Sequence, residues 1–285
     1  MLKKTNIMFL LIPVFIMFLI QTTISANNST KKLKFSNYAF NNYSQYGEDG
    51  IIQKIFEIIN TTSKICVEFG AWDGLHLSNT ANLWINHAWK GILIESDPIR
   101  FKQLAKNIEP YNCIAINATI GIEGKNSLKN ILNQFNIHDQ IDLLSIDIDG
   151  NDYYILKNLG TLRPRIIICE YNPTLPPTFD IYPEYNNYFG CSVAALIRVA
   201  EEHDYKLIAL TDTNAFFCVK EEFQKLSIFE TTLEKIKIDK YLMYIATSYD
   251  GKSIILGKQE KPAYGKICSQ YNKKVFLNNC FRIDH

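Results

Sequence analysis

Residues 64–74, KICVEFGAWDG, decide the fold of this chain. A short apolar run at 65–67 ends in Glu68, and three small residues follow it: Gly70, Ala71 and Gly74. Such a pattern is typical of a buried parallel strand that enters a small-residue loop and then a helix, where backbone N–H groups approach a ligand closely. We therefore predict a cofactor-binding loop directly after this strand.

The spacing of the loop indicates which ligand it suits. The chain reads E-x-G-x-x-x-G from Glu68 to Gly74, and not the G-x-G-x-x-G of a dinucleotide site, so no phosphate cradle is evident. An acid at the strand end suits a ligand that offers hydrogen-bond donors, such as the ammonium of an amino-acid moiety, and S-adenosylmethionine is the natural candidate. A glycine-rich turn taken alone is equally compatible with tight packing.

A second strand supplies the partner of Glu68. The segment GILIES, 91–96, reads as a buried strand that ends in Glu95. Adjacent parallel strands bring their carboxyl ends to one edge of the sheet, where open α/β sheets bind ligands. We expect Glu95 to accept hydrogen bonds from ribose hydroxyls there.

Further strand-and-helix repeats predict an α/β fold. Strands are expected at 113–121, 141–150 and 165–172, and helices at 51–59, 78–87, 98–107, 127–135, 152–159 and 192–203. The last strands, 205–212 and 214–220, are joined so tightly at Thr213 that they must pair antiparallel. We predict a doubly wound, Rossmann-like sheet of seven strands, five parallel plus an antiparallel C-terminal hairpin, with helices on both faces.

Acidic residues gather after the fourth and fifth strands. We expect Asp147 to be the principal acid at a reacting centre, with Asp149, Asp152 and Glu170 as competing bases or substrate ligands. Asp147 or Asp149 together with Glu170 and Asn172 would also offer the oxygen ligands that Mg²⁺ prefers. The favoured alternative is that these acids bond the backbone N–H groups of the helices that follow. The Pro-rich, aromatic segment 173–190 reads as a substrate lid or wall.

Seven short segments, in this order, resemble an FkbM-type methyltransferase domain of the class I S-adenosylmethionine-dependent superfamily: SQYGEDG, VEFGAWDG, IESDP, NATIG, SIDIDGNDYYIL, CEYNP and NAFF. The resemblance covers about residues 44–220. It implies S-adenosylmethionine as cofactor and O-methylation of a hydroxyl on a small metabolite, a lipid or a sugar of a glycan.

The resemblance also assigns residues to parts of the site. The cofactor loop is matched by Glu68, Gly70, Ala71 and Gly74, the ribose-binding turn by Glu95, Ser96, Asp97 and Pro98, and the adenine segment by Asn117 and Ala118. Asp147, Asp149 and Gly150 match the family's Asp-x-Glu-Gly. Departures from the family pattern are Trp72 for Asn, Ser96 for Pro, Ser145 for Lys and Asp149 for Glu.

The composition and the N-terminal segment of the chain indicate which partners and which cellular location to expect. With 285 residues, 47% of them hydrophobic, the chain can bury a full core, and a net charge of +1 without long basic runs beyond the N-terminal region argues against nucleic acid. Residues 1–26 read as a signal peptide or signal anchor, with membrane attachment through 7–24 in the second case. We expect a secreted, exported or single-pass anchored protein.

The remaining chain divides by composition. We expect a polar linker at 27–43, the methyltransferase-like domain at 44–220 and a C-terminal extension at 221–285. Seven cysteines without C-x-x-C spacing favour neither zinc nor a disulfide scaffold. Cys66, Cys113 and Cys169 read as small buried hydrophobes, and Cys268 and Cys280 could pair in an oxidising compartment.

Two other function classes remain open. An inactive methyltransferase fold could act as a binding module of the secretory or membrane system, because S-adenosylmethionine is made in the cytosol. A nucleotide-sugar enzyme would fit the same location. It is the less favoured of the two, because IDIDG, 146–150, is predicted inside a buried strand rather than as an isolated D-x-D.

Overall fold

The computed structural model describes residues 32–242, 244–247, 249, 253–256 and 281–283. The predicted signal segment, 1–26, and Cys268 and Cys280 lie outside the described residues. Within the described part of the chain, no helix combines the length and the apolar character that a membrane crossing requires. One compact unit spans Lys34–His285.

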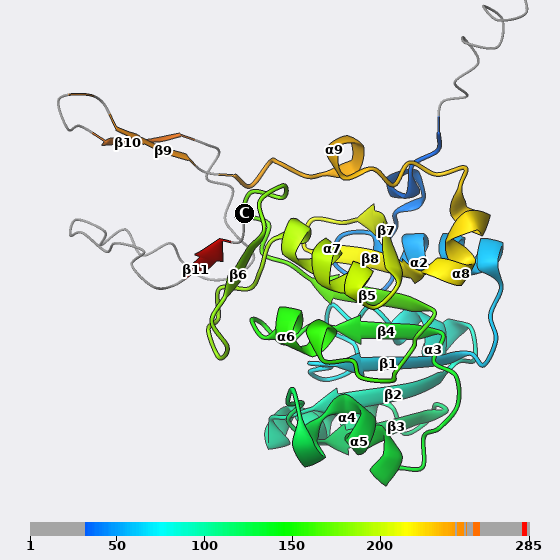
Figure 1. Cartoon of the computed structure of the whole chain (residues 1–285). Coiled ribbons are helices and arrows are strands. Elements are labelled where there is room, and N and C mark those ends of the chain that lie inside the picture. The colour runs from blue at the N-terminus through cyan, green and yellow to red at the C-terminus, as the bar shows by residue number, and fades with distance from the viewer. Residues whose placement is uncertain (1–31, 243, 248, 250–252, 257–280, 284–285) are drawn as a thin grey trace, which may run out of the picture. The chain divides into compact units, whose positions relative to one another are not determined.

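A seven-stranded sheet forms the centre of this unit, in the order β3-β2-β1-β4-β5-β8-β7 (Figure 1). The strands are β1 (Ile65–Phe69), β2 (Lys90–Glu95), β3 (Cys113–Asn117), β4 (Leu143–Ile146), β5 (Ile166–Glu170), β7 (Tyr205–Leu210) and β8 (Asn214–Val219). The first five are parallel, and β8 lies antiparallel between β5 and β7. The predicted fold class is confirmed, with six strands running one way and β8 opposing them.

Helices cover both faces of the sheet. Successive residues of β1 point to opposite sides, so that Val67 belongs to one apolar core and Cys66 to the other. The Val67 side is closed by α5 (Leu128–Gln134), α6 (Asp152–Lys157) and α7 (Val193–Glu202). The Cys66 side is closed by α2 (Glu48–Ile59), α3 (Ala81–Asn86) and α4 (Pro98–Asn107). Burial on both faces explains why these strands read as continuous apolar runs rather than alternating ones.

The helix α4 begins and ends where the sequence predicts. Asp97 is its N-cap and accepts hydrogen bonds from the N–H groups of Ile99 and Arg100, and Pro98 occupies the first turn. By contrast, α3 begins three residues later than predicted, because Ser78 and Thr80 bond to Glu68 instead of entering the helix.

The fourth strand is shorter than predicted, and this corrects the position of two acids. Strand β4 ends at Ile146, so Asp147 and Asp149 lie in the loop beyond it and not inside a buried strand. Asp149 has φ +57° and Gly150 has φ +146°, and such conformations cannot continue a strand. The position of IDIDG, 146–150, therefore no longer argues against a nucleotide-sugar enzyme.

Segments outside the predicted domain bounds pack into the same unit. Phe35, in the range predicted as linker, stacks on Phe229, in the range predicted as extension, with ring centroids 3.9 Å apart. Both rings are buried, as is Leu226. The helices η1 (Phe35–Tyr38), α8 (Lys220–Phe223), η3 (Gln224–Leu226) and α9 (Leu233–Ile236) belong to these flanks, and the helix η2 (Gly124–Asn126) precedes α5.

Two small sheets lie outside the main one. A hairpin in the C-terminal extension consists of β9 (Tyr244–Thr247) paired antiparallel with β10 (Ser253–Leu256). A short strand, β6 (Ile181–Pro183), lies in the segment predicted as a loop and pairs with β11 (Phe281–Ile283). The predicted apolar environment of the cysteines is confirmed for Cys66 and Cys169, which are fully buried free thiols, whereas Cys113 is half-buried.

Candidate functional site

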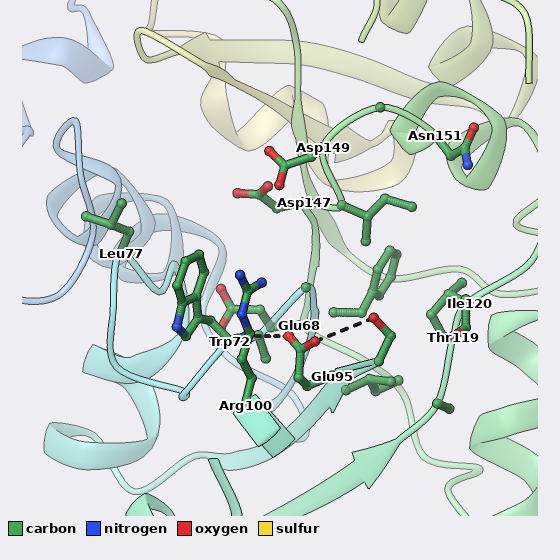
Figure 2. Close-up of a pocket in the computed structure, with 18 of the residues that line it drawn as sticks. Glu68, Trp72, Leu77, Glu95, Arg100, Thr119, Ile120, Asp147, Asp149 and Asn151 are labelled. Atoms are coloured by element: carbon green, nitrogen blue, oxygen red, sulfur yellow. Dashed lines mark hydrogen bonds between the residues drawn. The ribbon is translucent and has the colours of Figure 1, made fainter. Parts of the chain in front are cut away.

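A cavity of about 550 Å³ lies at the carboxyl ends of β1, β2, β3 and β4 (Figure 2). Loops after all four strands line it, together with residues 186–188 of the long loop after β5. The position is the one at which open α/β sheets bind ligands, and the volume falls within the usual range for small-molecule sites.

The loop after β1 approaches the end of β4 closely at Gly70. Gly70 has φ +74°, and a Cβ built on it would lie 1.6 Å from the carbonyl oxygen of Asp147. Only glycine therefore allows the cofactor loop to pass the acid loop at this distance. Trp72 also has a left-handed conformation, φ +50°, which asparagine adopts more readily than a bulky aromatic residue does.

Glu68 lines the cavity, but its carboxylate already has three protein partners. It accepts hydrogen bonds from the hydroxyls of Ser78 and Thr80, both at 2.6 Å, and from the N–H of Asn79 at 2.9 Å. Burial raises its pKa against the opposing effect of these bonds. A carboxylate has about four acceptor positions, so one remains for a ligand donor. Glu68 thus lines the cavity and also holds the segment 78–80, of which Ser78 lines the cavity too.

Glu95 is held by backbone donors at the opposite side of the cofactor loop. One carboxylate oxygen accepts from the N–H of Trp72 at 2.9 Å and the other from the N–H of Asp97 at 2.7 Å. The oxygen bonded to Trp72 keeps a free acceptor position, the other also accepts a long hydrogen bond from the hydroxyl of Ser96 at 3.5 Å, and Glu95 is only 4% exposed. Two such oxygens side by side suit a ligand with two neighbouring hydroxyls.

The segment after β3 was predicted to lie near the adenine, and its residues have two different roles: some line the cavity and Asn117 holds a neighbouring turn in place. Ala118 lines the cavity, followed by Thr119 and Ile120. The side-chain amide of Asn117 instead donates to the carbonyls of Glu95 and Ser96, at 2.8 and 3.2 Å. Asn117 therefore positions the turn that carries Glu95, and Ser96 itself lines the cavity.

Three of the four predicted acids meet at the upper end of the cavity. One carboxylate oxygen from each of Asp147, Asp149 and Glu170 lies within 4.8 Å of the others, and Figure 2 shows the carboxyl groups of Asp147 and Asp149 next to each other. Asp147 and Glu170 are hydrogen-bonded through their side chains, and burial together with the charges of Asp152 and Asp149 raises the pKa of Asp147 well above its ordinary value.

The oxygen donors of the same cluster could also hold a cation. Three carboxylates at this spacing fit a hard divalent cation. Asn172, predicted as a further ligand, instead uses its amide oxygen to accept from the N–H and hydroxyl of Thr174. The cluster alone identifies no metal, and a proton shared between Asp147 and Glu170 satisfies the same oxygens.

Asp152 bonds backbone N–H groups, as the favoured alternative predicts, but they belong to the preceding loop and not to a helix that follows. Its two carboxylate oxygens accept from the N–H groups of Ile148 and Gly150, each at 2.9 Å, and it is 2% exposed. Burial raises the pKa of Asp152 to about 6. Asp152 therefore closes the loop that presents Asp147 and Asp149.

This raised pKa predicts a pH dependence of stability. Because the folded chain holds the Asp152 proton more tightly than the unfolded chain does, its contribution to stability is present below about pH 4 and is lost as the pH rises through about 6. Two pKa units correspond to roughly 2–3 kcal/mol. Urea unfolding of the wild type and of Asp152→Asn measures this. The free energy of unfolding of the wild type, relative to that of the variant, should be lower at pH 7 than at pH 4 by about that amount. Parallel profiles of the two proteins would contradict the assignment.

The mouth of the cavity carries residues that sequence reasoning missed. The guanidinium carbon of Arg100 lies 3.6 Å from the centroid of the Trp72 ring, and His76 and Leu77 line the cavity beside them. Arg100 sits on the exposed side of α4, and no pattern in the sequence distinguishes it from other exposed cations. His203 is the C-cap of α7.

A second cavity of about 810 Å³ adjoins the first. The two share Asp149, Gly150 and residues 186–188. A Cβ on Gly150 would lie 2.9 Å from the carbonyl oxygen of Asn187, so the long loop and the acid loop are in close contact. The segment 173–190, predicted as a substrate lid or wall, contributes seven of the sixteen described lining residues of the second cavity.

Comparison with known proteins finds likeness only among solved structures. No protein-family model matches this chain, and no curated protein matches it. An S-adenosylmethionine-dependent methyltransferase from Clostridium acetobutylicum has a TM-score of 0.40 at 8% identity, over 72% of this chain and 97% of that one. A putative O-methyltransferase from Klebsiella pneumoniae has a TM-score of 0.40 at 12% identity, over 70% and 94%.

A tRNA (uracil-54, C5)-methyltransferase from Pyrococcus abyssi, in complex with S-adenosyl-L-homocysteine, has a TM-score of 0.36 at 12% identity. The match covers 63% of this chain and spans only 39% of that enzyme. At such identities and scores, these likenesses assign no residue role and no acceptor.

Proposed function

We propose that this chain is an S-adenosylmethionine-dependent methyltransferase that acts on a hydroxyl oxygen. The observation that carries the proposal is Glu95. Its buried carboxylate is held by the N–H groups of Trp72 and Asp97, inside a cavity whose other end holds Asp147. One oxygen has an open acceptor position, and the other has only the long 3.5 Å bond from the rotatable hydroxyl of Ser96 for a ligand hydroxyl to displace. A ribose diol at Glu95 and a cationic sulfonium near the acids would match both ends of the cavity.

The residues of the chain divide the chemistry between positioning and proton transfer. S-adenosylmethionine, when bound, supplies an electrophilic methyl group: the new C–O bond forms as the C–S bond breaks, and S-adenosylhomocysteine leaves. Glu95 and the loop at Gly70 hold the donor, and most of the rate gain comes from this alignment. Asp147 accepts the hydroxyl proton of the acceptor.

The raised pKa of Asp147 suits that task. A general base works best when its pKa lies close to the working pH, and burial among Asp149, Asp152 and Glu68 moves this carboxyl upward. Its hydrogen bond with Glu170 offers a path on which the accepted proton is shared. The proposed mechanism takes no step through a metal.

Calorimetric titration of the purified chain with S-adenosylmethionine and S-adenosylhomocysteine tests the cofactor site. Glu95→Gln should weaken both affinities by roughly 10- to 100-fold, because hydrogen bonds to a charged acceptor contribute about 1.5–3 kcal/mol. Glu109→Gln, an exposed position just beyond α4, is the matched control and should bind as wild type does. Failure of the folded wild-type chain to bind either compound would overturn the proposal.

The same titration separates the two alternatives. Binding of S-adenosylmethionine without methyl transfer to any acceptor would favour the non-catalytic binding module. A uridine diphosphate sugar in the syringe tests the nucleotide-sugar alternative, for which the loop position of Asp147 and Asp149 is the favourable feature. Tight binding of that compound with none of S-adenosylmethionine would replace the present proposal.

A further inference from the structure

We propose that the second cavity binds the methyl acceptor, and that the acceptor is an uncharged molecule with a hydroxyl on a ring. This inference rests on the proposed function, because it assigns the substrate of the same site.

The connection between the cavities supports the first half of the inference. Asp147 lines the first cavity and Glu170 lines the second, and their side chains are hydrogen-bonded. Asp149 lines both. A hydroxyl that enters from the second cavity therefore meets the acid cluster on the side opposite Glu95, as in-line transfer from a donor in the first cavity requires.

The charge of the lining supports the exclusion of anions. Apart from tyrosine hydroxyls, every ionisable side chain described in the lining is acidic, namely Asp149, Asp152 and Glu170, with no lysine, arginine or histidine among them. The nearby Lys240 forms an ion pair with Asp212. A phosphate or carboxylate buried here would lose its hydration without gaining a counter-charge, and such a burial is costly.

The carboxylates of the lining are already hydrogen-bonded or exposed to solvent, and they therefore offer no buried counter-ion to a cationic acceptor. Both oxygens of Asp152 accept backbone N–H groups, and Glu170 is bonded to Asp147. Asp149 is exposed to solvent, so its charge is screened. The lining thus repels anions without building a buried counter-ion for a cation.

Aromatic side chains give the cavity its shape. Five of them line it: Tyr46, Tyr171, Tyr188, Phe189 and Tyr241. Tyr188 is 88% exposed, so its ring is open to contact at the rim. Aromatic rings that carry a polar group bind flat molecules which combine apolar faces with hydroxyls. A phenolic ring and a sugar ring share this chemistry.

Two probe sets, each built on one kind of ring and differing chiefly in charge, test the inference. Catechol, protocatechuate and dopamine form the phenolic set, and methyl glucoside, glucuronate and glucosamine form the saccharide set. Binding is measured by saturation-transfer NMR on the full chain saturated with S-adenosylhomocysteine. At least one neutral probe should bind with an affinity at least about tenfold higher than that of its anionic counterpart. The set that contains this probe identifies the ring of the acceptor as phenolic or saccharide.

Three results would overturn the inference: an anionic probe that binds as well as its neutral counterpart, a cationic probe that binds better, or no binding of either neutral probe at about 10 mM. Thr174→Lys places a cation in the lining of the second cavity and should reduce the preference against the anionic probe. Thr161→Lys, an exposed position after α6, is the matched control and should leave the preference unchanged.

The controls also separate this inference from the proposed function. S-adenosylhomocysteine binding is measured first, and its absence in the wild type is a failure of the proposed function. Normal S-adenosylhomocysteine binding combined with no preference for uncharged probes is a failure of the acceptor assignment alone.

Discussion

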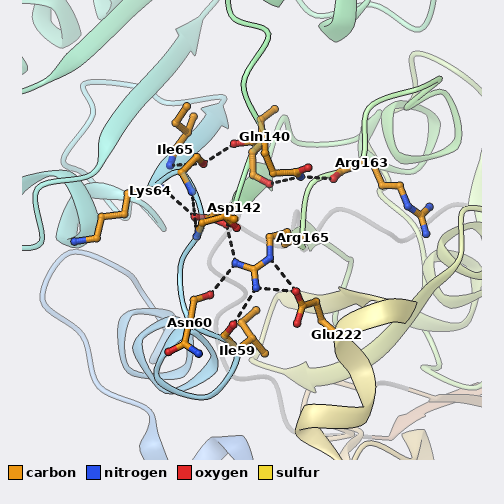
Figure 3. Close-up of polar contacts among 12 residues, drawn as sticks. Ile59, Asn60, Lys64, Ile65, Gln140, Asp142, Arg163, Arg165 and Glu222 are labelled. Atoms are coloured by element: carbon orange, nitrogen blue, oxygen red, sulfur yellow. Dashed lines mark hydrogen bonds and ion pairs between the residues drawn. The ribbon is translucent and has the colours of Figure 1, made fainter.

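Replacing Arg165 with methionine is expected to lower the free energy of unfolding by about 3–5 kcal/mol, the cost typical of breaking a buried ion pair. Figure 3 shows the guanidinium of Arg165 between three segments that are far apart in the sequence. It bonds the carboxylate of Asp142 at 2.8 Å and that of Glu222 at 2.8 Å. It also donates to the carbonyls of Ile59 and Asn60, at 3.0 and 2.7 Å.

The large effect follows from what the substitution leaves behind. Asp142 is fully buried, and its other donors are the hydroxyl of Thr62 and the N–H groups of Thr62, Ser63 and Lys64. Burial acts to raise the pKa of Asp142, but its hydrogen bonds, that from Arg165 foremost, hold the pKa below its ordinary value. Methionine fills similar space but provides neither charge nor donors. The buried carboxylate of Asp142 therefore loses its counter-charge, and the carbonyls of Ile59 and Asn60 lose the donor that Arg165 supplies.

Arg163→Met is the matched control. Arg163 also pairs with a glutamate of α8, Glu221 at 3.0 Å, but both side chains are well exposed. Exposed ion pairs contribute little, so this variant should unfold almost as the wild type does. Denaturant unfolding with unchanged slopes measures both effects. Equal losses in the two variants would show that burial of the Arg165 network does not decide its contribution.

Much of the fold follows from local patterns in the sequence. The apolar runs at β1, β2, β4 and β5 are long enough to identify strands buried on both faces, and Asp97 followed by Pro98 marks the start of α4. The positions of Glu68 and Glu95 at one sheet edge follow from parallel pairing of β1 with β2, which the structure has.

The partners of the acids did not follow from the sequence, because they are long-range. The motif SQYGEDG does not indicate that Glu48 accepts from the hydroxyl of Thr211 and the amide of Asn214, more than 160 residues away. By contrast, the approach of Asp147 to Glu170 was expected, and the pairing of β4 with β5 produces it. Strand ends were overestimated at β3, β4 and β5, since apolar periodicity does not register the positive φ of Asp149 that ends the strand at the acid loop.

The largest expected effect on activity is at Asp147. If Asp147 is the general base of the proposed reaction, Asp147→Asn should lower kcat by roughly 100- to 10,000-fold, the contribution usual for a positioned base. The dissociation constant for S-adenosylmethionine should change by less than about tenfold, because Glu95 and the loop at Gly70 are unaltered. Asp139→Asn, the same chemical change at an exposed position before β4, is the control and should keep the wild-type kcat.

The pH profile separates a base from a residue that only holds the loop. A base acts when deprotonated, so wild-type kcat/KM should rise with pH as Asp147 loses its proton, at a higher pH than an ordinary aspartate because burial and the charges of Asp152 and Asp149 raise its pKa. Asparagine has nearly the same shape and can still bond Glu170, so the variant keeps the geometry and loses only the proton acceptor. Its residual activity should therefore lack this rise. A variant that is slow but retains the wild-type profile would assign the proton to Asp149 or Glu170 and leave Asp147 a positioning role.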